Sequence, residues 1–385
     1  MSHVTISGAQ QFDTSLLVET RMFRRPRTTW ILGTFAIIAL ACATFVASSR
    51  SRASVLPTLS APLARMTLPD VPTVTSALAG SVAELPNQVG IAPSAPAERA
   101  DAHFDRSWRA PLAGGLLMFP PSFESADGQY DLVLHLNGNT DLVEESYGFA
   151  RVNAVIAILN LGVGSGLYED RFADPAAMRL MLSRAQDVMR ARGLKNARLR
   201  RIGLSSWSSG YGGIIKILGH EEFFDRVNAI VLIDSIHCGY DPHSKKLKPD
   251  QINPIRKYAE KAVRGDALLT IVHSEIVTYG YHNAHDTTDF VLDWVHTRRR
   301  PTREGQPLPT LVAMKNVVPN AYMRPLEPLT EAHQGELHVR GYDGSGPMTH
   351  MLHLIQFSTT ALPDLVRYWA SPKTSNVTSS NASKK

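Results

Sequence analysis

Short apolar runs alternate with segments of helical periodicity between residues 109 and 374. The predicted strands are 130–136, 154–161, 199–205, 229–234, 268–273 and 336–342. Runs that are apolar almost throughout are typical of parallel strands covered by helices on both faces. The pattern therefore predicts an α/β domain over 109–374, built on a doubly wound, mostly parallel sheet.

One helix in this region carries signals at both ends. Asp174 is a candidate N-cap, Pro175 suits the first helical position, and Gly193 is a candidate terminator. Apolar residues between them recur at helical spacing and predict the face that packs on the sheet. These residues are Met178, Leu180, Met181, Ala185 and Met189.

A long uncharged and mostly apolar segment occupies 30–48, where about 18 residues at about 1.5 Å each would just cross a bilayer. More arginines precede it, within 21–27, than follow it, at 50 and 52. This excess predicts that residues 1–29 form an N-terminal segment in the cytosol. The small residues of Val46-Ala47-Ser48 would also suit cleavage of a signal peptide. The segment is therefore either a membrane anchor or a cleaved signal peptide. Either one would place the rest of the chain outside the cytosol.

Two segments show no sustained periodicity. Residues 49–108 are rich in Pro, Ala and Ser, which predicts a disordered, extended linker. Residues 375–385 are rich in Ser, Asn and Lys and are predicted to form a disordered tail.

Composition and charge argue against a nucleic-acid partner, a disulfide and a structural zinc site. The chain has 385 residues, and its 40 basic side chains exceed the 35 acidic ones by only 5, without a basic cluster. This argues against a nucleic-acid partner. The cysteines Cys42 and Cys238 do not predict a disulfide, because the first lies in the apolar segment, and no Cys/His spacing typical of structural zinc is present.

The clearest chemical signal follows the predicted strand 199–205. The run Ser206-Trp207-Ser208-Ser209-Gly210 leads directly into the helical pattern at 214–218. A serine on a tight strand-to-helix turn needs small residues two positions before and two after it, and Ser206 and Gly210 meet that need. Ser208 is therefore the candidate nucleophile, although a Ser/Gly-rich turn is also common in α/β proteins that lack such chemistry.

This turn resembles the nucleophile elbow of the α/β-hydrolase superfamily, usually G-x-S-x-G, with Ser206 in place of the first glycine. The resemblance covers about residues 110–370. It implies an α/β-hydrolase fold, attack by Ser208 on an ester-like carbonyl, and no cofactor.

Asn137-Gly138-Asn139 ends the strand 130–136, where members of this superfamily commonly have His-Gly-X. The resemblance therefore implies an oxyanion hole formed by the backbone N–H groups of Asn139 and Ser209. The competing interpretation is an ordinary Asn-Gly turn.

The general base is expected in a loop after the last strand. His350 follows the strand 336–342 and the loop 343–347, so it is the candidate base, with His353 as the fallback. His338 lies inside the strand and is expected to be structural.

Two carboxylates at strand ends could complete the triad. Asp234 is preferred because it ends a very apolar strand and needs a partner there. Glu275 follows the next strand, in the region where the superfamily more often has its acid, and is the alternative. The choice between them stays open.

Two further motifs have ordinary interpretations. The run Gly162–Gly166 lacks the G-x-G-x-x-G spacing and no helix is expected to begin within it, so it predicts a flexible rim of the active site. His282, His285 and Asp286 could bind a metal, but Asp286 also suits the N-cap of the helix that follows. We therefore expect no metal site.

Together these features predict a membrane-tethered serine hydrolase that acts on a carboxylic ester or a related, small-molecule or lipid-like acyl substrate. Its catalytic domain would lie outside the cytosol, on the periplasmic side of a bacterial membrane, or be secreted if the N-terminal segment is cleaved. The alternative is a non-catalytic, membrane-tethered binding domain of the same fold.

Overall fold

The computed structural model describes residues 104–371, except 107, 108, 113, 242 and 245. The predicted cytosolic segment, the anchor or signal sequence at 30–48, most of the linker and the tail lie outside these residues. Phe104 belongs to the predicted linker, yet its ring packs on Phe119 with centroids 5.1 Å apart. Among the described helices, none is both long and apolar enough to cross a membrane.

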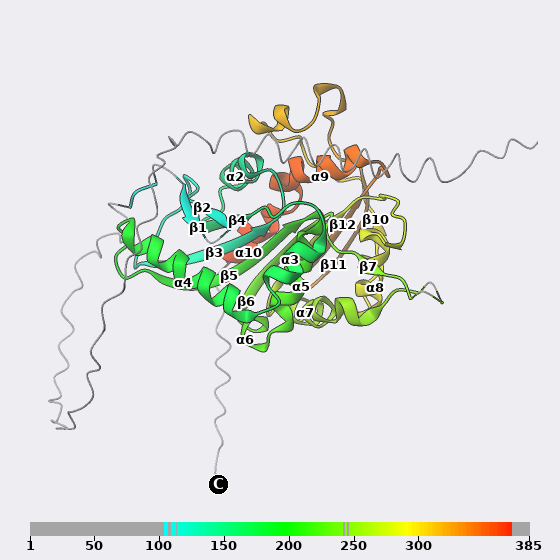
Figure 1. The fold of residues 1–385 in the computed structure, drawn as a ribbon. Helices are drawn as coiled ribbons and strands as arrows, with labels where there is room; N and C mark the ends of the chain where they lie inside the picture. Colours follow the sequence, from blue (N-terminus) through cyan, green and yellow to red (C-terminus); the bar gives the residue numbers. More distant parts are fainter. Residues whose placement is uncertain (1–103, 107–108, 113, 242, 245, 372–385) are drawn as a thin grey trace, which may run out of the picture. The chain divides into compact units, whose positions relative to one another are not determined.

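A mostly parallel sheet of 10 strands forms the centre of the domain (Figure 1). Its strands in spatial order are β1 (Ala110–Leu112), β2 (Gly115–Met118), β4 (Val155–Leu159), β3 (Gln129–Leu136), β5 (Arg198–Trp207), β6 (Val227–Ile233), β8 (Leu268–His273), β12 (Leu337–Tyr342), β11 (Pro328–Gln334) and β10 (Arg300–Pro301). The strands from β4 to β12 in this order pair in parallel, whereas the strands at both edges pair antiparallel.

Helices cover both faces of this sheet. The main ones are α2 (Thr140–Phe149), α3 (Ser165–Arg171), α4 (Pro175–Ala191), α5 (Tyr211–Gly219), α6 (Glu221–Phe224), α7 (Asn253–Val263), α8 (Ala284–Trp294), α9 (Pro347–Thr360) and α10 (Leu362–Ala370). In β3, Leu132 and Leu134 pack into the core beneath α4, α5 and α7, while Val133 packs into the core beneath α2, α9 and α10. Alternate residues of one strand thus contribute to two cores, which confirms the predicted α/β architecture.

The predicted strands correspond to β3, β4, β5, β6, β8 and β12, with ends that differ by up to two residues. The antiparallel edge strands and the short ribbon of β7 (Cys238–Gly239) and β9 (Tyr281–His282) were not predicted. These elements are too short or too polar to show an apolar run, so the sequence pattern could not reveal them.

Helix α4 begins and ends as predicted, with Asp174 accepting a hydrogen bond from the Ala176 N–H and Gly193 at a φ of 95° just beyond its end. The prediction for Leu180 is wrong, because its side chain is 48% exposed. Leu182 is buried instead, one helical turn after Met178. Residues 178, 181, 182, 185 and 189 follow the helical period better than a set that contains residue 180.

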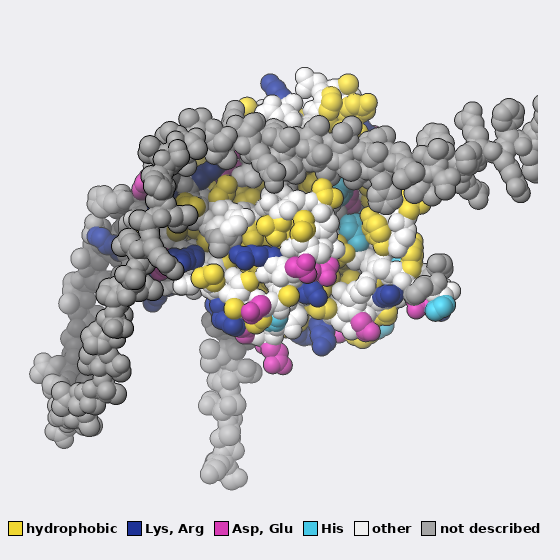
Figure 2. Space-filling view, viewed as in Figure 1, with side chains coloured by type: hydrophobic (Ala, Val, Ile, Leu, Met, Phe, Trp, Pro, Cys, Tyr) yellow, Lys and Arg dark blue, Asp and Glu magenta, His cyan; other side chains and the backbone are white. Residues whose placement is uncertain are grey.

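Acidic and basic side chains are mixed on the surface. Figure 2 shows Lys and Arg beside Asp and Glu over the visible helices of one face, without a continuous patch of either sign. Ion pairs such as Arg179 with Glu222 and Lys216 with Glu169 join neighbouring helices there. This mixture agrees with the small net charge of the whole chain.

Candidate active site

Ser208 lies at the turn where β5 ends at Trp207 and a short 3₁₀ helix, η1 (Ser208–Gly210), begins before α5. Its φ is 53°, which is uncommon for a residue with a side chain. A Cβ on Gly210 would lie only 2.3 Å from the Leu136 carbonyl oxygen, so only glycine fits there. Neighbouring backbone thus forces a sharp turn that presents a partly exposed Ser208.

Ser206 replaces the first glycine of the usual motif and has a bonded role. Its buried hydroxyl lies 2.7 Å from Ser235 Oγ. The Ser235 hydroxyl donates to the carbonyl oxygen of Ser208 at 2.7 Å, so Ser206 must donate to Ser235. This chain of two hydrogen bonds holds the backbone of the turn against the end of β6, and it accounts for a serine at this position.

His350 lies in the first turn of α9 and contacts Asp234, which directly follows β6. The distance between His350 Nδ1 and Asp234 Oδ2 is 2.7 Å, and the Asp234 side chain is fully buried. A carboxylate can only accept, so Nδ1 carries a proton, and in the neutral ring Nε2 presents a lone pair. The arrangement prepares Nε2 to take up a proton.

Trp207 joins this pair to the turn. Its ring stacks on the His350 ring with centroids 4.6 Å apart and planes at 26°, and its Nε1–H donates to the His350 carbonyl at 3.1 Å. Because Trp207 directly precedes Ser208, the His350 ring lies against the residue before the predicted nucleophile.

Asp234 is held by more than His350. Its Oδ1 accepts from the Ser274 N–H at 2.9 Å, and its Oδ2 accepts from the Ser274 hydroxyl at 2.8 Å. Burial alone would raise the pKa of Asp234, but His353, His350 and the Ser274 N–H together hold that pKa far below its ordinary value. The carboxylate is therefore ionised and oriented.

Glu275, the alternative acid, faces another histidine. Its Oε1 lies 2.6 Å from His285 Nδ1. Of the two candidate acids, Asp234 is the one that contacts His350.

The loop after β3 lies against the turn. Asn137, at a φ of 68°, donates through Nδ2 to the Trp207 carbonyl at 3.1 Å and to Ser209 Oγ at 3.3 Å. Asn139 is the N-cap of α2, and its side chain accepts from the Leu142 N–H. The Ser209 N–H lies in the first turn of a helix, where backbone donors lack intrahelical acceptors. The two predicted oxyanion donors thus belong to segments that Asn137 connects.

His135 was not recognised from the sequence, because it lies inside an apolar strand. It is fully buried, its Nε2 lies 3.0 Å from the Asn137 carbonyl, and its Nδ1 lies 3.0 Å from Ser205 Oγ. Burial lowers its pKa to about 3, so the ring is neutral. His135 therefore positions the loop behind the turn without a charge.

The other predicted histidines have structural surroundings. His353 is fully buried on α9 beside Tyr342, and within the described residues neither ring nitrogen has a hydrogen-bond partner. Burial lowers its pKa to about 4, so the ring is uncharged at neutral pH. The hydrogen bonds to Asp234 come from His350 and Ser274. His338 lies in β12 and contacts Arg367 and Glu336, as expected of a structural residue.

The glycine-rich run Gly162–Gly166 follows β4, and the expectation that no helix begins within it is wrong. Helix α3 begins within it, at Ser165, directly after Gly164. A Cβ on Gly212 of α5 would lie 2.7 Å from the Ser165 carbonyl oxygen, so glycine allows α3 to pack closely on α5. Asn160 donates to the Gly138 carbonyl at 2.8 Å, which places the start of this run beside the loop after β3.

The possible metal ligands indicated by the sequence, His282, His285 and Asp286, do not face one common point. His282 contacts Asp286 at 3.3 Å, whereas His285 contacts Glu275 and Asp289. The N-cap of α8 is Asn283, not Asp286, because the Asn283 side chain accepts from the Asp286 N–H. Among the described side chains, those that could share a metal ion here are His273, Glu275 and His285.

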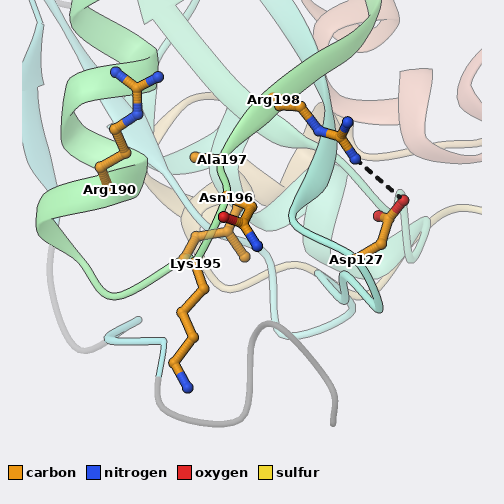
Figure 3. Close-up of a pocket in the computed structure, with 7 residues that line it drawn as sticks. Asp127, Arg190, Lys195, Asn196, Ala197 and Arg198 are labelled. Atoms are coloured by element: carbon orange, nitrogen blue, oxygen red, sulfur yellow. Dashed lines mark ion pairs between the residues drawn. The ribbon is translucent and has the colours of Figure 1, made fainter. Parts of the chain in front are cut away.

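A basic hollow of about 670 Å³ lies elsewhere, lined by Arg190, Lys195, Arg198 and Asp127 (Figure 3). Arg198 begins β5, whereas Ser208 follows its end. A strand of 10 residues spans about 33 Å, so the hollow lies at the opposite end of β5 from the turn. We assign it no part in the chemistry of Ser208.

No protein-family model matches the chain, and no curated protein is significantly similar to it. The functional assignment consequently depends on the geometry described above.

Proposed function

We propose that this chain is a serine hydrolase of the α/β-hydrolase fold that cleaves a carboxylic ester or a related acyl substrate. The observation that carries the proposal is the 2.7 Å contact between His350 Nδ1 and Asp234, with the His350 ring stacked on the residue before Ser208. The chain order, serine then aspartate then histidine, is that of α/β-hydrolases. A serine at positive φ between a strand and a helix is also typical of their nucleophile elbow.

In the acylation step, Ser208 Oγ attacks the substrate carbonyl carbon while His350 Nε2 takes the hydroxyl proton. Asp234 keeps the proton on Nδ1 and stabilises the imidazolium that forms. The carbonyl oxygen becomes an oxyanion, for which the N–H groups of Asn139 and Ser209 are the proposed donors. When the tetrahedral intermediate collapses, His350 returns the proton to the leaving alcohol.

Deacylation repeats these roles with water. Water loses a proton to His350 Nε2 and attacks the acyl carbon, and the proton then passes to Ser208 Oγ as the acid leaves. The enzyme is restored, and one ester and one water give one alcohol and one acid. None of these steps requires a cofactor.

The location of the domain is part of the same proposal. The apolar segment 30–48 would anchor the chain, or direct its secretion if cleaved, so that the substrate is met outside the cytosol. An acyl substrate from the envelope would suit that location.

Hydrolysis of simple esters tests the proposal. Purified full-length protein in detergent is assayed with p-nitrophenyl acetate, butyrate, octanoate and palmitate, beside Ser208→Ala and the matched control Ser183→Ala, which changes an exposed serine on α4. We expect the first variant to lose at least about 10³-fold in kcat/KM and the control to lose nothing. Equal activity of Ser208→Ala and the parent protein would refute the proposal.

A further inference from the structure

His273, Glu275 and His285 converge from two elements. His273 ends β8, Glu275 follows two residues later, and His285 lies in the first turn of α8. One ligand atom from each of the three side chains lies within 4.8 Å of the others. The fold thus assembles two imidazoles and a carboxylate that the proposed triad does not use.

His273 offers an unused lone pair. Its side chain is fully buried, and its Nδ1 lies 3.1 Å from the Ser274 carbonyl oxygen, to which it must donate. Nε2 therefore carries the lone pair, and among the described residues it has no hydrogen-bond partner. A buried acceptor without a donor is uncommon and calls for a partner such as an ion.

His285 is oriented from behind in the way that metal-bound histidines are. Its Nε2 lies 3.1 Å from Asp289 Oδ2, and Asp289 is in turn held by Arg299. A carboxylate on the far nitrogen fixes the ring and directs Nδ1 toward the ligand position. For His273 the Ser274 carbonyl has the same role. Both imidazoles thus have outer partners already in place.

We propose that His273 Nε2, His285 Nδ1 and a Glu275 carboxylate oxygen form a site for a zinc-class divalent transition metal. Two imidazoles and one carboxylate suit Zn²⁺, whereas Ca²⁺ and Mg²⁺ prefer oxygen ligands alone. A water molecule would complete a tetrahedron.

Binding requires a small rearrangement. Glu275 and His285 pair directly at 2.6 Å, so the ion replaces the proton that they share, and that proton passes to solvent. Ligand atoms around tetrahedral zinc lie about 3.3 Å apart, so shifts of about an ångström in the side chains complete the site.

The ion would act on the triad through Ser274. Ser274 lies between two of the ligands, His273 and Glu275, and both its N–H and its hydroxyl donate to Asp234. Fixing this segment would fix the orientation of Asp234, which makes the ligands positioning residues. This consequence rests on the proposed hydrolase function, whereas metal binding itself does not.

Zinc binding by the full chain tests the site. Untagged protein is treated with chelator, dialysed, and titrated with Zn²⁺ by calorimetry, with bound metal measured by mass spectrometry. We expect about one tightly bound ion per chain and at least about a tenfold weaker affinity in Glu275→Gln and His285→Gln. The matched control, His282→Gln, changes a nearby histidine that contacts Asp286 and Tyr240 and should bind like the parent protein.

Cobalt gives a second readout that does not depend on stability or hydrolysis. Co²⁺ in the parent protein and in His282→Gln should show the visible absorption of a tetrahedral site, and His273→Gln should lose it. Equal zinc affinity and equal cobalt spectra in the parent protein and all three ligand variants would overturn the site. If zinc binds as expected while Ser208→Ala hydrolyses esters as fast as the parent protein, the hydrolase proposal fails and the metal site stands.

Discussion

The Trp207 indole stacks on the His350 ring and donates to the His350 carbonyl at 3.1 Å. These residues lie 143 positions apart in sequence, yet the contact links the end of β5 to the first turn of α9. The indole thus contacts the imidazole that would accept the Ser208 proton, and it belongs to the residue directly before that serine. This arrangement makes Trp207 a positioning residue in the proposed site.

Trp207→Phe should keep the stacked ring and lose the N–H donor. We expect kcat/KM to fall about fivefold, because one hydrogen bond is worth about 1 kcal/mol. KM should change little, since the indole acts through His350 rather than on the substrate. Steady-state kinetics with p-nitrophenyl butyrate measure the effect, and thermal denaturation shows whether the fold is kept. Unchanged kcat/KM in a folded variant would contradict this role.

Asp234→Asn tests the acid. The amide can donate to His350 and favour the wrong tautomer, so we expect kcat to fall by about 10³- to 10⁴-fold. Asp293→Asn is the matched control, because Asp293 is exposed on α8. The same assay applies to both variants. A loss of less than tenfold in Asp234→Asn would mean that Asp234 does not orient the base.

The choice of Asp234 over Glu275 shows where sequence reasoning stops. Both carboxylates follow apolar strands, and nothing in their local patterns tells which one faces His350. The structure separates them through their partners: Ser274 and His350, distant in sequence, bind Asp234, whereas His285, 10 positions along the chain, binds Glu275. The turn at Ser208 could be predicted because its determinants, Ser206 and Gly210, are its neighbours in the chain.

The same distinction applies to the fold. Central strands such as β8 were predicted because burial on both faces leaves a continuous apolar run. Strand β11, which lies between β12 and the edge strand β10, is largely polar, so it shows no apolar run and gave no signal. His135 and Asn137 were missed as supports of the site for a related reason, since their roles depend on β5 residues about 70 positions away.

His353→Phe tests the pH dependence of stability. Its native pKa of about 4 lies below the ordinary value of 6.5, so the unfolded chain binds protons more readily below pH 6.5. Stability from this group is therefore fully present above pH 6.5 and is lost as the pH falls toward 4, by up to about 1.4 kcal/mol per unit.

We expect His353→Phe to be as stable as the parent protein at pH 7, because neither ring nitrogen has a partner among the described residues. Between pH 6.5 and 4.5 the variant should lose less stability than the parent protein. Urea unfolding followed by fluorescence at several pH values measures the difference. Parallel pH profiles for the two proteins would show that His353 is not buried in its neutral form.

Gly210→Ala tests the packing of the turn. The added Cβ would meet the Leu136 carbonyl oxygen at 2.3 Å, so backbone must move. We expect a loss of at least about 3 kcal/mol in stability, or failure to fold. Gly219→Ala, at the end of α5, meets no atom within 4 Å and should be neutral or stabilising. Urea unfolding compares the two, and equal stability would show that the close approach to β3 is not required.

Labelling with a fluorophosphonate probe tests the central claim most directly. The probe reacts with serines that a neighbouring base activates, so full-length protein should gain one adduct, and peptide mass spectrometry should locate it on Ser208. His350→Ala should remain folded and lose the labelling, while Ser183→Ala should label like the parent protein. An adduct on Ser208 that disappears with His350 is the predicted result. Folded protein that stays unlabelled, or that is labelled only at another serine, would contradict the account.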